Sequence, residues 1–398
     1  MHSPFKFLAS ALAACVLAGC QLNPTAGALS AGATALQEQR FAAAFQEIEN
    51  QLARKAFPGA VLAVGVDGRL VVLKAFGKMD ASPDAPLMPV DAIFDVASLT
   101  KVAAATTAAA LLHDQGRLDL DAPVARYIPE FAGPQGHAGI TVRHLLSHSS
   151  GLPSPLLLWQ HAKTREELLK LVYALPAEWP PGIHFDYRDE NFILLGEIVE
   201  RISGQRLDRF LAGRAFEPLG MKDTGFNPSP ALLARIPPTE QDNHFRHALV
   251  RGTVHDESAH VMGGVSGHAG LFSTAADLAR LAQLYLDRGR FNGVRLLSAQ
   301  TVDRFTTRQD LPPGSSRALG WDTPNGNANT FAGPLASPDA VMHTGFTGTS
   351  IYIDRSRNAF IVLLTNRVNP SRENRQIGAA RIAIHSAVLS ALDAGAAR

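Results

Sequence analysis

The stretch "AVLAVGVDGRLVVLKAFG", residues 60–77, decides the fold class. Two runs rich in valine and leucine flank Asp67-Gly68, a pair typical of the two-residue turn of a β-hairpin. Near the other end of the chain, "IYID" (351–354) and "AFIVLLT" (359–365) flank the polar turn "RSRN" in the same way. Two hairpins predict a sheet that is at least partly antiparallel, which excludes a doubly wound nucleotide-binding fold.

The region between the two hairpins is helical in its pattern. Alanine-rich or periodically apolar stretches predict helices there: "VAAATTAAALLHDQG" (102–116), "REELLKLVYAL" (165–175) and "FILLGEIVERISG" (192–204). Further helices are predicted over 41–52, from Thr274 and after Pro370. We therefore expect an α/β lobe formed by 37–100 and 270–398, and a mostly helical lobe formed by 101–269. A cleft between two lobes is a favoured place for a binding site.

The N-terminus has the pattern of an export signal. A short basic segment precedes an apolar run of roughly a dozen residues that ends in "LAGC" (17–20). These residues resemble the lipobox of bacterial lipoproteins, which implies a signal peptide over 1–20 and lipidation of Cys20; a plain secretory signal is the alternative. A small, polar tether follows over 21–36. Because Gln21 and not Asp follows Cys20, analogy with lipoprotein sorting favours a periplasm-facing anchor in the outer membrane.

Bulk composition describes an ordinary globular protein. The chain has 398 residues, and 46% of them are hydrophobic. Its net charge of +1 does not indicate a basic surface for nucleic-acid binding. Its two cysteines, Cys15 and Cys20, both lie in the signal region, so the exported body has no disulfide. No segment after the signal reads as long and apolar enough to span a membrane. We expect a monomer that binds no nucleic acid.

The stretch "FDVASLTK", residues 94–101, places Ser98 three positions before Lys101. The spacing alone is weak, because about one such pair is expected by chance in a chain of this length. Here, however, Ser98 opens a predicted helix, so both side chains share one face and lie near the positive helix N-terminus. Lys101 can activate Ser98 only when neutral, and burial among alanines would lower its pKa. A surface lysine beside a helix-capping serine is the alternative interpretation of the pair.

Two later motifs, "YRD" (187–189) and "HTG" (343–345), follow the Ser-x-x-Lys motif in order. This series resembles the penicillin-binding proteins and class C β-lactamases over nearly all of the exported length. Further stretches support the resemblance: "ITVRHLLSHSSGLP" (140–153), "FEPLGMKDTGF" (216–226), "GHAGLFSTAADLARLAQLYL" (267–286) and "LGWD" (319–322). The resemblance implies an α/β fold of α+β type, in which helices flank an antiparallel five-stranded sheet and a second lobe is all-helical.

The resemblance also implies roles for individual residues. Ser98 would attack a carbonyl and form an acyl-enzyme, Lys101 would accept its proton, and Tyr187 would relay a proton to the leaving group. The backbone N–H groups of Ser98 and Phe346 would bind the oxyanion. Gly345 would let the substrate lie against a strand edge. The substrate would therefore contact Asp189, His343, Thr344, Gly345 and Phe346.

Two of these positions depart from the usual pattern of the family. Asp189 stands where Asn is usual, and an ionised carboxylate offers no N–H donor to a substrate. It could instead accept from Lys101 and hold it charged, or Glu190 or Asn191 could take over the role of Asn. His343 stands where Lys is usual and carries full charge only below a pKa of about 6.5, so recognition of a substrate carboxylate should weaken near neutral pH.

The main hypothesis is an exported serine hydrolase, a D,D-carboxypeptidase-like penicillin-binding protein acting on peptidoglycan peptides without a cofactor. One alternative is an esterase of small acyl esters, or a weak β-lactamase. Another is a non-catalytic lipoprotein that binds the cell wall. No metal is expected, because the spacing of four candidate ligands matches no usual zinc pattern: His255, Asp256, Glu257 and His268.

The sequence also predicts positions or structural roles for several other polar residues. Ser266 and His268 are expected on a loop near the cleft, and His144 and His148 are expected to be structural. Asn366 and Arg367 follow the last strand and could line the site or form a solvated turn.

Overall fold

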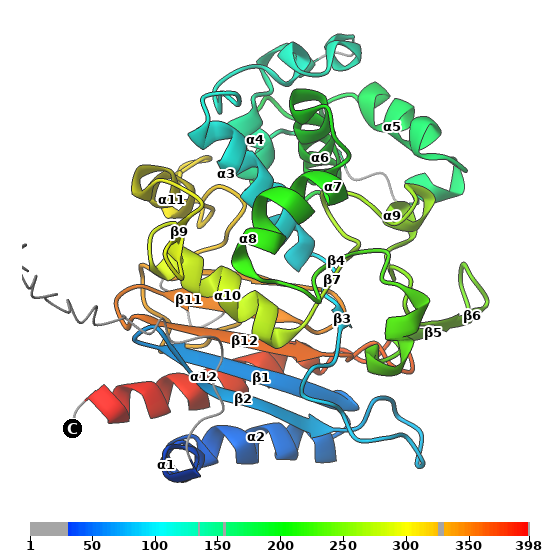
Figure 1. Ribbon diagram of the computed structural model, residues 1–398. Helices are drawn as coiled ribbons and strands as arrows, with labels where there is room; N and C mark the ends of the chain where they lie inside the picture. The colour runs from blue at the N-terminus through cyan, green and yellow to red at the C-terminus, as the bar shows by residue number, and fades with distance from the viewer. Residues whose placement is uncertain (1–30, 134–135, 154–156, 325–329, 397–398) are drawn as a thin grey trace, which may run out of the picture.

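The computed structural model describes residues 31–133, 136–153, 157–324 and 330–396 (Figure 1). Its main sheet has five antiparallel strands in the order β10-β11-β12-β1-β2. The strands are β1 (Gly59–Val66), β2 (Arg69–Gly77), β10 (Val341–Thr344), β11 (Ser350–Asp354) and β12 (Ala359–Thr365). Both predicted hairpins and the predicted five-stranded sheet are confirmed.

The expected signal peptide and Cys20 lie outside the described residues. Helix α1 (Ala31–Arg40) begins inside the expected tether, so the last residues of that segment are helical.

The turn between β1 and β2 has the geometry that its sequence predicts. Asp67 and Gly68 have φ angles of 49° and 74°, both in the left-handed region that the two-residue hairpin turn requires. Strand β1 is buried on both faces, and successive side chains alternate between two cores: Val61 in one, and Leu62 in the other. Gly65 packs against β12, where a Cβ would lie 2.1 Å from the Phe360 ring.

Helices α2 (Ala42–Ala53) and α12 (Ile377–Ala396) cover one face of the sheet (Figure 1). Their buried side chains, such as Ile48 and Ile384, share a core with Leu62. Among the described residues, α12 is the one helix whose length and composition would suit a membrane span. The prediction that no such segment follows the signal was therefore wrong. The apolar side of α12 packs on the sheet, as in the core helix of a globular domain.

Helix α10 (Ala275–Leu286) covers the opposite face, and the helical lobe stands beyond it (Figure 1). The helix predicted from Thr274 is confirmed, and Thr274 caps it by accepting a hydrogen bond from the backbone N–H of Asp277 at 3.1 Å. The other α-helices are α3 (Thr107–Asp114), α4 (Val142–Leu146), α5 (Arg165–Ala174), α6 (Asp189–Ser203), α7 (Leu207–Leu211), α8 (Glu217–Leu219), α9 (Glu257–Val261) and α11 (Ala299–Thr306). Segments Lys101–Thr106 and Ala212–Phe216 are π-helical.

Short strands join the two lobes and interrupt the helical one. A three-stranded sheet has the order β3 (Phe94–Asp95), β7 (Leu271–Ser273), β4 (Gly225–Phe226). Two small hairpins are formed by β5 (Glu240–Asp242) with β6 (Ala248–Val250) and by β8 (Arg290–Phe291) with β9 (Val294–Arg295). The second lobe is therefore mostly helical and not all-helical. Strand β3 leads directly into the candidate active site.

Candidate active site

Ser98 lies in a tight turn between β3 and the π-helical segment. The preceding residue, Ala97, has a φ of 48°, an unusual value for a residue with a Cβ. Asp95 fixes this turn, because its buried carboxylate accepts hydrogen bonds from the backbone N–H of Ala97 at 2.9 Å and of His255 at 2.7 Å. The side chain of Ser98 is only partly buried. The turn therefore holds the hydroxyl at the start of a helix and leaves it accessible.

Lys101 lies at the centre of a group of polar contacts. Its Nζ is 3.0 Å from Ser98 Oγ, 3.1 Å from the backbone oxygen of His268 and 2.7 Å from Asp189 Oδ1. The ammonium also lies 4.9 Å from the centre of the Tyr187 ring, and the lysine is fully buried. The structure thus brings together the three residues to which the resemblance assigns catalysis. The alternative of a surface lysine is wrong.

The charge of Lys101 differs from what burial alone would give. Burial acts to lower its pKa, but the nearby Asp189 carboxylate and the Tyr187 phenol outweigh it and raise the pKa above its ordinary value. Lys101 is therefore an ammonium in the resting protein. The sequence argument from alanine-rich surroundings was incomplete, because it left out the carboxylate. The structure supports the alternative in which Asp189 holds the lysine charged.

Tyr187 is held in place from behind by His148. The two rings stack with centroids 4.4 Å apart, and His148 is fully buried. Its Nδ1 accepts hydrogen bonds from the backbone N–H of Arg188 at 3.1 Å and from Asn191 Nδ2 at 3.3 Å. Burial, followed by the neighbouring cations, lowers the pKa of His148 well below its usual value, so it stays a neutral acceptor. Its structural role was predicted, but its place under Tyr187 was not.

The structure also tests the substitutes considered for the missing Asn. Asn191 is fully buried, and its Oδ1 accepts a hydrogen bond from Ser150 Oγ at 2.6 Å, so its amide is engaged inside the protein. Glu190 is 4% exposed. Neither residue replaces the usual donor, and Asp189 is the member of this motif that faces Lys101.

Burial raises the pKa of Glu190 to about 7, from 4.5 in an exposed site. Between these two values the folded chain binds more protons than the unfolded chain, so its stability falls as pH rises through about 7. We expect Glu190→Gln to gain roughly 3 kcal/mol over the wild type on going from pH 5 to pH 8. Urea unfolding at both pH values measures the change. The exposed Glu166→Gln is the control, and equal gains in both variants would contradict the prediction.

The third motif ends β10 beside the turn that holds Ser98. At Gly345 an added Cβ would lie 2.3 Å from the backbone oxygen of Val96, so glycine is required by close packing of the two segments. That a substrate lies against this strand edge stays a prediction, and close packing is an independent reason for glycine here. Within the described residues, neither the Ser98 nor the Phe346 backbone N–H donates a hydrogen bond. Both remain free to bind an oxyanion.

Asn366 and Arg367 support the Phe346 loop and do not form a solvated turn. Arg367 Nε donates to the Phe346 backbone oxygen at 2.7 Å, and its guanidinium lies 4.2 Å from the centre of the Phe346 ring. Asn366 Nδ2 donates to the backbone oxygen of Met79 at 2.8 Å, and both residues are buried. Their contacts fix the segment that follows the third motif.

His343 is buried, and its Nδ1 donates to the backbone oxygen of Thr344 at 2.9 Å. Burial, and then the charges of Arg317 and Lys101, lower its pKa well below 6.5. The imidazole is therefore neutral at neutral pH and cannot replace the positive charge of the usual lysine.

Behind Lys101 lies a hydrogen-bonded chain of three polar side chains, of which Ser266 and His268 are buried and Asp256 is partly exposed. Ser266 Oγ is 2.7 Å from His268 Nδ1, and His268 Nε2 is 2.9 Å from Asp256 Oδ1. The expected position of Ser266 and His268 beside the cleft is confirmed by the contact between Lys101 and the His268 backbone oxygen. Ser266 is 3% exposed, so its hydroxyl is closed to a substrate.

The four residues weighed as metal ligands do not converge. His255 pairs with Glu240 at 2.7 Å, and Glu257 pairs with Arg372 at 2.9 Å. Asp256 and His268 do lie close to Asp189, with ligand atoms within 4.8 Å of one another. In this arrangement the ammonium of Lys101 supplies the positive charge beside Asp189.

Comparison with known proteins agrees with this geometry. The family described as Beta-lactamase matches residues 44–385. The chain belongs to the β-lactamase family. A protein of Escherichia coli (strain K12) named "Putative D-alanyl-D-alanine carboxypeptidase" is 36% identical over 350 residues, or 78% of this chain and 79% of that protein. A protein of Bacillus subtilis (strain 168) named "N-acetylmuramyl-L-alanine amidase" is 35% identical over 355 residues, or 81% and 80% of the two chains.

Solved structures share the fold of this β-lactamase-family chain. The hydrolase EstCE1, described as having promiscuous acyltransferase activity, superposes with a TM-score of 0.72 and 22% identity, covering 89% of this chain and all of the other. A penicillin-binding protein homologue from Caulobacter crescentus gives 0.69 and 23% identity, covering 87% and 97%. Members of the β-lactamase family are serine hydrolases, and this chain is an enzyme of that class.

Proposed function

We propose that this β-lactamase-family enzyme forms an acyl-enzyme at Ser98 and acts as a D,D-carboxypeptidase on peptidoglycan peptides. The main supporting observation is the 3.0 Å contact between Ser98 Oγ and Lys101 Nζ, beside two backbone N–H groups without a partner in the described chain. The relatives named as D-alanyl-D-alanine carboxypeptidases support the substrate class.

The proposed proton path begins with the ion pair of Lys101 and Asp189. Asp189 is 44% exposed, so a bound substrate would displace water from it and make its ionised form less favourable. A proton can then pass from Nζ to Oδ1, which are 2.7 Å apart, and leave a neutral amine beside Ser98 Oγ. That amine takes the serine proton as the Oγ–carbon bond forms. Tyr187 then relays a proton to the leaving amine as the carbon–nitrogen bond breaks, and water later hydrolyses the ester.

A digest of defined muropeptides ending in D-Ala-D-Ala tests the proposed reaction. We expect mass spectrometry to show loss of the terminal D-alanine with the wild type and none with Ser98→Ala. The identity to a relative named as an amidase makes cleavage between the muramyl group and L-alanine the second candidate. The two products differ in mass, so one digest separates the reactions. Loss of neither group would contradict both.

An esterase is the remaining catalytic alternative. Two features favour it: residue 189 offers no amide donor, and His343 carries no charge. A small ester with a good leaving group needs neither an amide donor nor a positive charge at these positions. Turnover of p-nitrophenyl acetate or butyrate, with no D-alanine released from muropeptides, would select this alternative. Any turnover that depends on Ser98 would exclude the non-catalytic wall-binding protein.

We further propose that the enzyme is exported and anchored through a lipid on Cys20, facing the periplasm from the outer membrane. The support is the lipobox-like end of the N-terminal apolar run. Metabolic labelling with a radioactive fatty acid should mark the wild type and not Cys20→Ala. Equal labelling of both, or recovery of the wild type in the soluble fraction, would contradict the anchor.

A further inference from the structure

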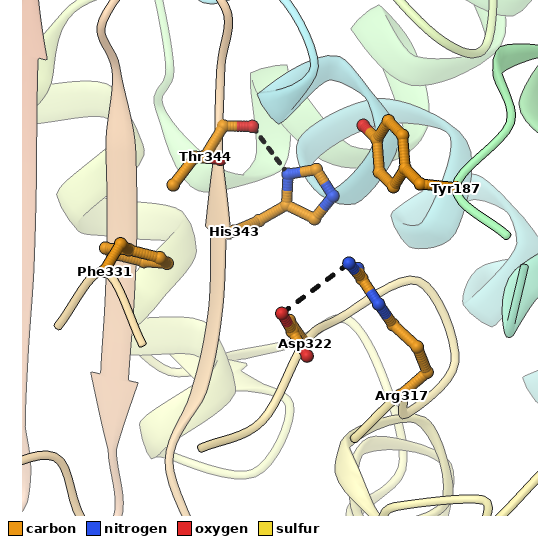
Figure 2. A pocket seen from close by; sticks show the side chains of 6 residues that line it. All are labelled: Tyr187, Arg317, Asp322, Phe331, His343 and Thr344. Atoms are coloured by element: carbon orange, nitrogen blue, oxygen red, sulfur yellow. Dashed lines mark hydrogen bonds and ion pairs between the residues drawn. The ribbon is translucent and has the colours of Figure 1, made fainter. Parts of the chain in front are cut away.

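A cavity of about 220 Å³ adjoins the candidate active site (Figure 2). Six residues line it: Tyr187, Arg317, Asp322, Phe331, His343 and Thr344. Tyr187 contacts Lys101, and Thr344 belongs to the third motif, so the cavity shares a wall with the proposed catalytic group. Tyr187 itself lines the cavity, and it is the residue that we propose to deliver a proton to the leaving group.

Arg317 enters this cavity from a different part of the chain, the loop that precedes β10. Figure 2 shows its guanidinium directed toward the side where His343 and Tyr187 lie. The guanidinium carbon is 4.8 Å from the centre of the Phe185 ring and 5.5 Å from that of Tyr187, and the side chain is 11% exposed. Its position is therefore fixed by aromatic packing.

The hydrogen-bonding capacity of Arg317 is largely unused. Within the described residues, its buried Nε and Nη1 have no partner. The nearest carboxylate is Asp322, with Nη2 3.6 Å from Oδ2, which is beyond hydrogen-bond distance. The other oxygen of Asp322 accepts from Ser316 Oγ at 2.6 Å and from the Thr323 N–H at 2.9 Å. Asp322 thus offsets part of the charge without satisfying the donors.

The other basic groups at the site are not available for a ligand anion. Lys101 is paired with Asp189, and His343 is buried with its Nδ1 bound to the backbone. A guanidinium with free donors is the group that proteins use to bind carboxylates, often through two parallel hydrogen bonds. The cavity volume suits a small group such as an amino-acid carboxyl end, and is several times that of one water.

We propose that Arg317 is the substrate-carboxylate receptor of this enzyme, so that it prefers acyl substrates whose leaving group carries a free carboxylate. This inference rests on the proposed acylation at Ser98 and names the substrate feature that the same site selects. The usual lysine of the third motif is absent here, because its position is occupied by His343. Arg317, from another segment of the chain, supplies the positive charge instead. It binds the leaving group and takes no part in bond making.

A pair of matched esters tests this inference. One acyl group is presented as its ester with lactic acid and as its ester with methyl lactate, which differ only in the free carboxylate. For the wild type we expect kcat/KM to be about 10- to 100-fold higher for the lactic acid ester. In Arg317→Ala this preference should fall to near unity, through loss on the lactic acid ester alone. Arg317→Lys should keep part of the preference, because it keeps the charge.

Arg308→Ala is the matched control. Arg308 lies on the neighbouring segment, donates to Thr323 Oγ1 at 2.9 Å, and does not line the cavity. The Arg308→Ala variant removes the same charge and should keep the wild-type preference for the lactic acid ester. Equal kcat/KM for the two esters in the wild type, or an equal loss of preference in both alanine variants, would overturn the role of Arg317. Turnover of the methyl ester reports on Ser98 separately, so failure of this inference would leave acylation at Ser98 standing.

Discussion

Replacement of Ser98 by alanine is expected to lower kcat/KM about 10⁴- to 10⁶-fold and to abolish the covalent adduct. The Ser98 hydroxyl is the only nucleophile for acylation in our scheme, because it lies 3.0 Å from Lys101 Nζ on a residue that is only partly buried. Intact mass spectrometry after exposure to a labelled penicillin, and separately to an activated ester, measures the adduct. The wild type should gain the mass of one acyl group, and Ser98→Ala should gain none.

Ser266→Ala is the control that makes this experiment decisive. Ser266 forms a serine–histidine–aspartate arrangement with His268 and Asp256, and by geometry alone it is a competing nucleophile. Its 3% exposure closes it to substrates. The Ser266→Ala variant should therefore still form the adduct. An adduct that persists in Ser98→Ala and disappears in Ser266→Ala would show that Ser266, and not Ser98, is the nucleophile.

The parts of the fold that local signals determine could be predicted from the sequence. Asp67-Gly68 specifies a turn, and this turn sets the pairing of the two apolar runs on either side of it. The pairing of β1 with β12 depends on contacts between distant segments, which no local pattern encodes. The same limit explains Gly345, whose need for glycine comes from the backbone of Val96. Helix α12 was misjudged at the level of composition, because its length and hydropathy do suit a membrane span; that its apolar side packs on the sheet only the structure shows.

The candidate site divides in the same way. Ser98 and Lys101 are one helical turn apart, so their contact follows from local geometry. The charge of Lys101 depends on Asp189, which a different helix brings to it, and the sequence could only pose this as an alternative. Arg317 belongs to no motif, and its importance rests on the absence of partners around it in the described structure. A sequence shows which groups are present but not which remain unsatisfied.

Replacement of Asp189 by asparagine is expected to move the acidic limb of the pH–rate profile for acylation by more than one unit toward lower pH. The carboxylate is the main group that raises the pKa of Lys101 against its burial, so its removal lets burial lower that pKa. Each unit by which the pKa falls gives about tenfold more neutral amine at a fixed pH below it. At pH 7, the rate of acylation by a penicillin should rise at least about tenfold. Because the pKa of Lys101 in the wild type lies above its ordinary value of 10.5, stopped-flow measurement from about pH 6 to pH 11 records the profile, and the wild-type rate should still be rising at the alkaline end.

Asp186→Asn is the matched control, because Asp186 lies in the same turn and pairs with Arg188 instead of Lys101. It removes the same charge three residues earlier and should leave the acidic limb where the wild type has it. Asparagine at 189 also adds an N–H donor, which would speed acylation without moving the limb. A faster rate with an unmoved limb would therefore assign the gain to substrate binding, and would contradict the view that Asp189 controls the protonation of Lys101. A slower rate would also contradict this prediction, and would show that acylation needs the carboxylate as the acceptor of the proton from Lys101 Nζ.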